Sequence, residues 1–300
     1  MLEEQIIACG YVAIVGRPNV GKSTLLNKIL GQKLSITSHK PQTTRHQILG
    51  IKTLEQVQTI YVDTPGLHKK AKHTLNQYMN RVAQQALTSV DVIGFVVEGL
   101  RWTDEDEWIL TKLQKLTNPV ILIINKIDEI QPKTALLPHM EALMQKMKFA
   151  DVIPLSAKNG ENVAALEKLL AKFLPQGPQL FPDDQITNRS DRFLVAEIIR
   201  EKLTRYLHQE LPYALTVEIE EFKTKGKILH ISAIIWLERE GQKAIVIGEK
   251  GEGLKMIGQR ARMDLEKIFA QKVFLRLWVK IKENWSDDAR ALKSLGYDDE

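Results

Sequence analysis

Eight residues near the start of the chain, Gly16-Arg17-Pro18-Asn19-Val20-Gly21-Lys22-Ser23, carry more structural information than any other stretch. They fit the pattern G-x-x-x-x-G-K-[ST], whose glycines let the backbone wrap a phosphate chain at a helix N-terminus. The apolar run 6–15 before them predicts a buried strand, and helical spacing follows at Leu25, Leu26, Ile29 and Leu30. We therefore predict a phosphate-binding loop between a strand and a helix, with Lys22 on the β- and γ-phosphates and Ser23 on Mg²⁺.

The chain as a whole has the length and composition of a globular protein with two domains. It has 300 residues, of which 44% are hydrophobic and 26% charged. Its single cysteine, Cys9, cannot form an internal disulfide, which favours a reducing cytoplasm. No apolar run approaches the roughly 18 residues of a membrane-spanning helix. Glu3 and Glu4 precede the first apolar run, which argues against a secretion signal and for a strand.

The first half alternates strand-like and helix-like segments. Apolar runs at 57–62, 90–97, 120–124 and 152–155 are separated by helical patterns at 75–88, 105–116, 134–147 and 161–173. Strands that are apolar on both faces predict a mainly parallel sheet covered on each side, hence a three-layer α/β P-loop domain. Pro175, Gly177, Pro178 and Pro182 mark a linker. We expect domains at 1–175 and 186–300, joined by residues 176–185.

The second half follows a different order. It predicts a helix at 190–207, strands at 215–220 and 229–237, helices at 241–247 and 254–268, and a strand at 273–281. The order α-β-β-α-α-β indicates an α+β domain with an antiparallel or mixed sheet. Phe274 and Trp278 share the non-core face of the last strand; we expect them to pack against the helix 190–207, with stacking on bases as the alternative.

Asn125-Lys126-Ile127-Asp128 follows the core strand 120–124 and predicts the choice of base. A carboxylate at Asp128 can accept hydrogen bonds from N1–H and the 2-amino group of guanine. Adenine would leave this carboxylate unpaired, and an unpaired buried charge is costly. We expect Asn125 to tie this loop to the phosphate loop and the stem of Lys126 to cover the base.

Three further segments are expected around the phosphates and the base. Asp63-Thr64-Pro65-Gly66 follows the strand 57–62, and we expect Asp63 to hold Mg²⁺ through water and the Gly66 N–H to contact the γ-phosphate. Ser156-Ala157-Lys158 follows the strand 152–155 and is placed to support the guanine. One threonine of the segment 40–45 should complete the Mg²⁺ shell; we favour Thr44 over Thr43, although spacing does not decide between them.

Leu67 stands where Ras-like hydrolases usually carry the glutamine that orients the attacking water. Leucine can neither donate nor accept a hydrogen bond, so we expect slow intrinsic hydrolysis or help from other groups. Asn19 offers two readings: it ligates a monovalent cation beside the phosphates, or it only stabilises the turn.

The ordered motifs G-R-P-N-V-G-K-S, Q-T-T-R-H, D-T-P-G-L-H, N-K-I-D and S-A-K, with the later V-I-G-E-K-G and L-K-S-L-G-Y, resemble the Era family of bacterial GTPases over essentially the whole chain. The resemblance implies a GTPase domain followed by a type II KH domain, binding to the 3′ end of 16S ribosomal RNA, assistance in 30S subunit biogenesis, and partial inner-membrane association of a cytoplasmic monomer. The GTP-contacting set comprises Gly16, Arg17, Pro18, Asn19, Val20, Gly21, Lys22, Ser23, Thr24, Asp63, Thr64, Pro65, Gly66, Leu67, Asn125, Lys126, Ile127, Asp128, Ser156, Ala157 and Lys158. The metal set is Ser23, Thr44 and Asp63, the catalytic set Lys22, Thr44 and Gly66, and potassium is a further expected cofactor.

Gly248-x-x-Gly251 is the candidate RNA loop. A KH domain uses such a tight loop between two helices to clamp about four nucleotides. The block 239–282 holds 11 Lys and Arg against 5 Asp and Glu, as a polyanion-facing surface requires, although a solvated charged face is the plainer alternative. The expected RNA-binding residues are Ile247, Gly248, Glu249, Lys250, Gly251, Lys255 and Arg262.

Three functions fit these features. The leading hypothesis is a GTP-hydrolysing switch whose nucleotide state controls RNA binding across the linker. The second is a constitutive RNA chaperone or assembly scaffold in which hydrolysis is incidental. The third, an RNA-modifying enzyme, needs a second active site, and residues 183–300 contain no cysteine and only the isolated His208 and His230.

Overall fold

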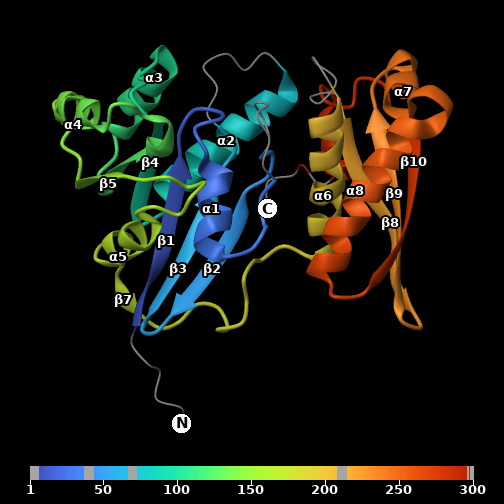
Figure 1. Ribbon diagram of the computed structural model, residues 1–300, viewed down its shortest axis with the longest axis horizontal. Helices are drawn as coiled ribbons and strands as arrows, with labels where there is room; N and C mark the ends of the chain where they lie inside the picture. Colours follow the sequence, from blue (N-terminus) through green and yellow to red (C-terminus); the bar gives the residue numbers. More distant parts are fainter. Residues whose placement is uncertain (1–6, 37–43, 67–72, 208–214, 296, 298–300) are drawn as a thin grey trace, which may run out of the picture. The chain divides into compact units, whose positions relative to one another are not determined.

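The computed structural model describes residues 7–36, 44–66, 73–207, 215–295 and 297, which fall into two compact units (Figure 1). One unit is made of residues 1–71 and 76–188, the other of 72–75 and 189–300. The elements up to residue 188 are β1 (Ile7–Val15), α1 (Lys22–Leu30), β2 (Ile48–Leu54), β3 (Val57–Asp63), α2 (Thr74–Thr88), β4 (Val92–Glu98), α3 (Asp104–Leu113), β5 (Val120–Asn125), α4 (Leu136–Met144), β6 (Asp151–Pro154), α5 (Val163–Ala171) and β7 (Gln176–Gly177).

The described strands of the first unit form one sheet in the order β2-β3-β1-β4-β5-β6, with the short β7 paired to β1. The pairs β1–β3, β1–β4, β4–β5 and β5–β6 are parallel, whereas β2 and β7 are antiparallel to their partners. Because β1 is buried on both faces, Val12 and Ile14 join the core that includes α1 and α5, and Ala13 and Val15 the core that includes α2, α3 and α4. The predicted three-layer α/β fold with a mainly parallel sheet is confirmed.

The carboxyl ends of the parallel strands form a single edge. Ile14 is in register with Asp63, and Glu98 with Asn125. Ligands of open α/β sheets bind at this edge, where loops and helix N-termini converge. The candidate nucleotide-binding residues that the structure describes therefore lie along one edge of the sheet, although Gly16 and Lys158 are 142 positions apart in the chain.

The second unit contains α6 (Asp191–Tyr206), β8 (Leu215–Lys225), β9 (Ile228–Leu237), α7 (Glu240–Ile247), α8 (Glu252–Ile268), β10 (Lys272–Ile281) and α9 (Ala289–Ser294). The sheet order is β10-β9-β8, with β10 parallel and β8 antiparallel to β9, so the predicted mixed sheet is confirmed. Ser190 caps α6 as expected, because its hydroxyl accepts a hydrogen bond from the Phe193 N–H. The helices α6, α7 and α8 pack on the inner face of the sheet, whose side chains form one core.

One expectation about this sheet is wrong. Phe274 and Trp278 do not pack against α6: they are 46% and 51% exposed on the face of the sheet opposite the core. The two rings do lie on the non-core face of β10, as expected, but α6 packs with Val273 and Leu275 on the core face and therefore cannot cover them.

Residues 176–185, where we expected a linker, lie against the first unit, as does Thr187 beyond them. Gln58 of β3 donates to the Phe181 carbonyl oxygen at 2.7 Å and accepts from the Leu180 N–H at 2.9 Å. The β7 strand pairs with β1, and Thr187 forms a bridge to Gly50.

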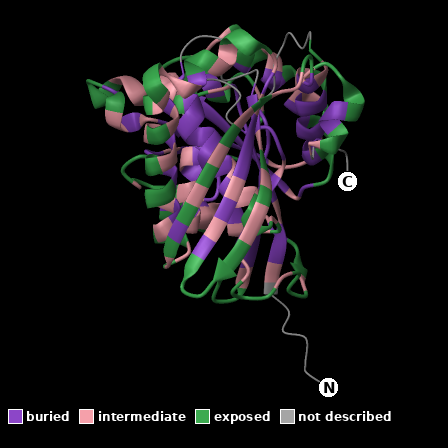
Figure 2. Cartoon of the chain, turned by 90° about the vertical axis from the view of Figure 1, so that its right-hand side faces the viewer, coloured by how far each residue is buried: buried purple, intermediate pink, exposed green. Residues whose placement is uncertain are grey.

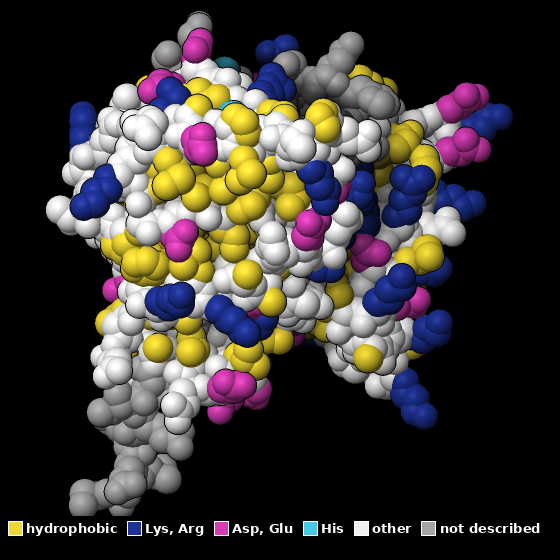
Figure 3. All heavy atoms as spheres, turned by 60° about the vertical axis from the view of Figure 1, so that its left-hand side comes forward, with side chains coloured by type: hydrophobic (Ala, Val, Ile, Leu, Met, Phe, Trp, Pro, Cys, Tyr) yellow, Lys and Arg dark blue, Asp and Glu magenta, His cyan; other side chains and the backbone are white. Residues whose placement is uncertain are grey.

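The surface of the first unit carries hydrophobic side chains. They gather on the face that Figure 3 brings forward, the side of α3, α4 and α5. In α4, Leu137 is 67% and Met144 51% exposed. Within the part of the chain that is described, no helix is both long enough and apolar enough to span a bilayer.

Candidate nucleotide-binding site

The phosphate loop has the backbone that its sequence requires. Gly16 and Gly21 have positive φ angles of 154° and 101°, and Asn19 adopts the left-handed conformation at φ 66°. A Cβ atom on Gly16 would lie 2.3 Å from the Val96 carbonyl oxygen, and one on Gly21 would lie 2.2 Å from Asn125 Nδ2. Glycine is therefore needed at both positions for conformation and for space. The loop leads into the N-terminus of α1, where N–H groups and the helix dipole favour an anion.

Lys22 lies buried inside this loop. Its Nζ donates to the carbonyl oxygens of Gly16 at 2.9 Å and Arg17 at 2.8 Å. Burial disfavours the ammonium form and lowers the pKa of Lys22 to about 8, although the nearby Asp63 carboxylate partly opposes this effect. A phosphate chain would supply the negative charge that this buried lysine needs.

Two hydroxyls and a carboxylate converge beside the lysine. Asp63 Oδ2 accepts from Thr44 Oγ1 at 3.2 Å and from Ser23 Oγ at 3.4 Å, and the two hydroxyl oxygens are 3.1 Å apart. All three side chains are buried, and Asp63 Oδ1 has no hydrogen-bond partner among the described residues. Burial raises the pKa of Asp63, against the opposing effect of Lys22 and the hydroxyls. Two hydroxyl groups and a carboxylate with one unsatisfied oxygen are hard oxygen ligands, and such ligands fit Mg²⁺.

Asn125 clamps the loops of the base site together. Its Nδ2 donates to the Val20 carbonyl oxygen at 2.7 Å, and its Oδ1 accepts from the Ala157 N–H at 2.9 Å. Asp128 Oδ1 accepts from the Ser156 hydroxyl at 2.6 Å. The expected link from Asn125 to the phosphate loop is present, and the S-A-K segment is brought to the same place.

Two acids near the site were not singled out from the sequence. Glu98, the last residue of β4, accepts from Arg17 through one oxygen and from Lys126 Nζ at 2.5 Å through the other. Partial burial opposes ionisation of Glu98, but these hydrogen bonds outweigh it and lower its pKa. Asp106 accepts from Arg17 Nε at 3.2 Å. The sequence could have indicated Glu98 by its position at the carboxyl end of a core strand, the same position that Asp63 and Asn125 occupy.

Gly66 reaches the phosphate loop from β3. A Cβ atom at Gly66 would lie 3.3 Å from Pro18 Cγ and 3.5 Å from Lys22 Nζ, so the backbone of Gly66 borders the lysine. Thr64 also belongs here, because its hydroxyl donates to the Ile14 carbonyl oxygen at 3.4 Å. Leu67 and Thr43 lie outside the described residues.

The Gly248-x-x-Gly251 loop joins α7 to α8 as expected. Gly248 and Gly251 have φ angles of 74° and 85°, and the lysine between them, Lys250, is also left-handed at 48°. Lys250, Lys255 and Arg262 are exposed, and no ion pair is formed by them within the described ranges. Their positive charge is thus available to a polyanion.

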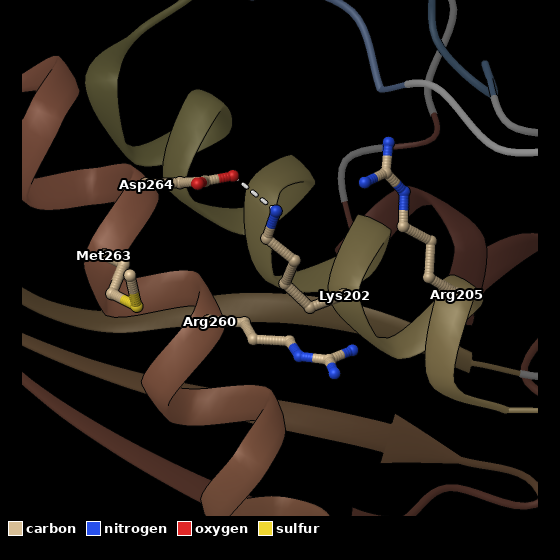
Figure 4. Close-up of a pocket in the computed structure, with 5 residues that line it drawn as sticks. All are labelled: Lys202, Arg205, Arg260, Met263 and Asp264. Carbon is tan, nitrogen blue, oxygen red and sulfur yellow. Dashed lines mark hydrogen bonds and ion pairs between the residues drawn. The ribbon is translucent and has the colours of Figure 1, made fainter.

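A pocket lies elsewhere in this unit, between α6 and α8 (Figure 4). Its lining comprises Lys202, Arg205, Arg260, Met263 and Asp264. Lys202 is paired with Asp264, as the dashed line in Figure 4 marks, and Arg205 with Glu201. Two of its three cations are therefore already neutralised.

A phosphate loop, an N-K-x-D loop clamped to it, and a separate G-x-x-G unit define the class: a P-loop GTPase joined to a KH domain. Comparisons with known proteins agree with this class. Residues 11–126 match the family described as 50S ribosome-binding GTPase, and residues 210–286 match the KH domain family.

Full-length relatives give the family. GTPase Era of Pseudomonas aeruginosa is 62% identical over 291 residues, which cover 97% of this chain and 95% of the relative. GTPase Era of Azotobacter vinelandii is 60% identical over 299 residues, covering 100% of both chains. A crystal structure of an Aquifex aeolicus Era variant bound to GDP·AlF4⁻ superposes with a TM-score of 0.94, at 42% identity over 97% of this chain and 99% of that one. The chain belongs to the Era family of GTPases, which confirms the resemblance stated from its motifs.

Proposed function

We propose that this protein is a GTP-hydrolysing switch that binds the 3′ end of 16S ribosomal RNA through its KH domain and assists 30S subunit biogenesis. The observation that carries the proposal is the presence of two built sites in one chain: the Asn125-clamped nucleotide loops and the G-x-x-G loop with its exposed cations. A solved Era structure with 42% identity and a TM-score of 0.93, covering 97% of this chain and 99% of that one, is a complex with MgGDPNP and nucleotides 1506–1542 of 16S ribosomal RNA. We extend that partner to this chain.

Guanine selectivity is proposed to come from Asp128. The Ser156 hydroxyl fixes one of its carboxylate oxygens, which orients the group in the loop that Asn125 holds. The carboxylate then accepts from N1–H and the 2-amino group of guanine, whereas adenine presents an acceptor to it. Lys126, whose ammonium group donates to Glu98, is proposed to cover the base with its stem. Calorimetry with GTP and ATP tests this, and equal affinities would refute it.

The metal site is proposed at Ser23, Thr44 and Asp63. Bound Mg²⁺ neutralises charge on the β- and γ-phosphates during transfer. The protein's own part is to hold the two hydroxyls and the carboxylate within 3.1 to 3.4 Å of one another before any ligand arrives. Lys22 would exchange its two loop carbonyl oxygens for phosphate oxygens, which offset the cost of its burial.

Hydrolysis is proposed to be slow without a stimulating factor. Leu67 cannot orient water, so Lys22, Thr44 and the Gly66 N–H remain as the catalytic contacts to the phosphates. We also propose that Asn19 in the phosphate loop helps to hold a potassium ion. Equal rates of GTP hydrolysis in KCl and NaCl would exclude the potassium ion. Fast GTP hydrolysis by the isolated protein would show that Leu67 does not slow the reaction.

The remaining proposals concern the whole chain. We propose domain limits at 1–175 and 186–300 around a linker at 176–185, a monomeric cytoplasmic protein, and peripheral association with the inner membrane. The hydrophobic face in Figure 3 is the surface of the GTPase domain to examine for membrane contact. Flotation with vesicles of bacterial lipid tests the membrane association, and gel filtration tests the monomeric state.

Switch behaviour is tested by measuring RNA affinity in two nucleotide states. A synthetic RNA of nucleotides 1506–1542 is titrated into protein loaded with GDP or with a non-hydrolysable GTP analogue. We expect the two affinities to differ, with the same factor appearing reciprocally in nucleotide affinity. Equal affinities would favour the constitutive scaffold instead. Lys250→Glu should weaken RNA binding and leave GTP affinity unchanged.

A further inference from the structure

The three-stranded sheet of the KH domain has one face that no described helix covers. The helices α6, α7 and α8 share a core with the inward side chains of the strands. Figure 2 looks onto the opposite face; exposed residues alternate along most of β10 with half-buried ones, whereas β9 is mostly half-buried and buried. A large exposed surface of this kind on a small domain calls for an explanation when its side chains are aromatic.

Along β10 this outer face alternates cations with aromatic rings. The five residues are Lys272, Phe274, Arg276, Trp278 and Lys280, and all of them are exposed. No acid interrupts the series on this strand, and the one acid beside Lys272 among the described residues is Glu266 of α8, 3.9 Å from a lysine side chain that is 81% exposed. The two rings are four residues apart, about 13 Å along a strand. One base cannot lie on both rings, whereas a strand of nucleotides running along β10 meets them in turn.

The neighbouring strand β9 adds further rings beside the cations. His230 lies next to Phe274, with ring centroids 5.1 Å apart, and Arg276 is 5.6 Å from the centroid of Phe274. Lys280 lies 5.8 Å from the centroid of Trp236. Phe274 and Trp236 therefore each have a cation beside the ring, and Trp278 lies between Arg276 and Lys280 on the outer face of β10. A nucleotide carries an aromatic base and a phosphate, so it can stack on the rings and pair with the cations at the same time.

The third strand bounds the surface. Glu218 of β8 accepts from Trp236 Nε1 at 2.8 Å, and Glu220 lies 3.6 Å from Lys280 Nζ. These acids repel a polyanion from β8. The part of the face that suits a polyanion is therefore the strip along β10 and β9, which is narrow and follows the strand direction.

We propose that this strip is a second RNA-binding surface, on which bases of a single strand stack on Phe274 and Trp278 while Lys272, Arg276 and Lys280 meet its phosphates. The inference rests on the proposed RNA-binding function and adds to the G-x-x-G loop. Aromatic rings spaced along a basic strip are the means by which proteins hold single strands, because every base has a π-face. A KH loop clamps only about four nucleotides, whereas the RNA in the related complex spans nucleotides 1506–1542. An apolar partner is disfavoured, because Arg276 separates the two rings.

The test uses the full chain with two outer-face variants, Phe274→Ala/Trp278→Ala and Arg276→Glu. Matched controls are Met263→Ala, which is 51% exposed on α8, and Lys267→Glu on the same helix. Each protein is titrated with the RNA of nucleotides 1506–1542 and with a four-nucleotide fragment covering only the KH clamp. We expect at least tenfold weaker binding of the long RNA by the outer-face variants, with binding of the short fragment, GTP affinity and melting temperature unchanged.

Two outcomes separate this inference from the proposed function. If wild-type protein binds the RNA and Lys250→Glu weakens it, but the outer-face variants bind like Met263→Ala and Lys267→Glu, the second surface is refuted and the KH function stands. If neither RNA binds the wild type, both proposals fail. Loss of binding to anionic lipid vesicles, with RNA affinity intact, would likewise overturn the inference in favour of a membrane surface. Photo-crosslinking of a 4-thiouridine-substituted RNA to the β10 peptide would support it directly.

Discussion

Replacing Asn125 by alanine should both destabilise the GTPase domain and weaken GTP binding. The side chain makes two buried hydrogen bonds, to the Val20 carbonyl oxygen and from the Ala157 N–H. Each such bond contributes about 1 kcal/mol, and each group left buried without a partner costs about 1–3 kcal/mol. The two groups left unpaired therefore lower the free energy of unfolding by about 2–6 kcal/mol. A domain of this size has about 5–15 kcal/mol, so it stays folded over most of that range.

The matched control is Asn118→Ala. The side-chain amide of Asn118 donates one hydrogen bond, at 2.6 Å to the Val90 carbonyl oxygen, and it lies at the amino ends of the strands, away from the nucleotide site. Urea denaturation of the nucleotide-free proteins should show a loss of about 1 kcal/mol for the control and at least twice that for Asn125→Ala. GTP affinity, measured by calorimetry, should fall at least tenfold in Asn125→Ala alone. If both variants lose the same stability, or if Asn125→Ala keeps its GTP affinity, the clamp does not hold the site together.

Three further predictions follow from the two sites. Because burial lowers the pKa of Lys22 from 10.5 to about 8, the folded state binds fewer protons than the unfolded state between these values. The stability of the nucleotide-free wild type, relative to Lys22→Met, should rise by about 3 kcal/mol as pH increases from below 8 to above 10.5; a flat difference in urea midpoints would contradict this. Thr44→Val should raise the Mg²⁺ concentration needed for half-maximal GTP hydrolysis about tenfold or more, and an unchanged requirement would shift the ligand role to Thr43. Gly248→Ala should destabilise the protein more than Gly251→Ala, because a Cβ atom on Gly248 would lie 2.8 Å from the Gly253 nitrogen. A Cβ atom on Gly251 would meet nothing within 4 Å, so that substitution should cost only about 1–2 kcal/mol, the cost of a left-handed backbone. Equal melting temperatures of the two variants would show that glycine is not sterically required at position 248.

The sequence predicted the fold where local patterns carry the information. The alternation of apolar runs and helical spacing placed the parallel strands and their helices to within a few residues, and Ser190 marked the start of α6. It did not indicate β2, β7 or α9. Those three elements are short or lie at an edge, and they are defined by their partners: β2 by its antiparallel pairing with β3 along Ile48–Leu54. Periodicity within a segment does not show which neighbour it will meet.

The candidate site divides in the same way. Motif chemistry alone identified the phosphate loop, the carboxylate proposed to read the base and the candidate metal ligands, because a phosphate chain or a purine edge requires particular groups at fixed spacing. The sequence could not show that Glu98 bridges Arg17 and Lys126, since Arg17 follows β1, Glu98 ends β4 and Lys126 follows β5, and they meet only at the edge of the folded sheet. It placed Phe274 and Trp278 correctly on the non-core face but wrongly expected α6 to cover them, because the face on which a helix packs is a long-range property. Local chemistry was therefore fixed by residue order, whereas the joining of distant residues and the exposure of the outer sheet face were decided by tertiary packing.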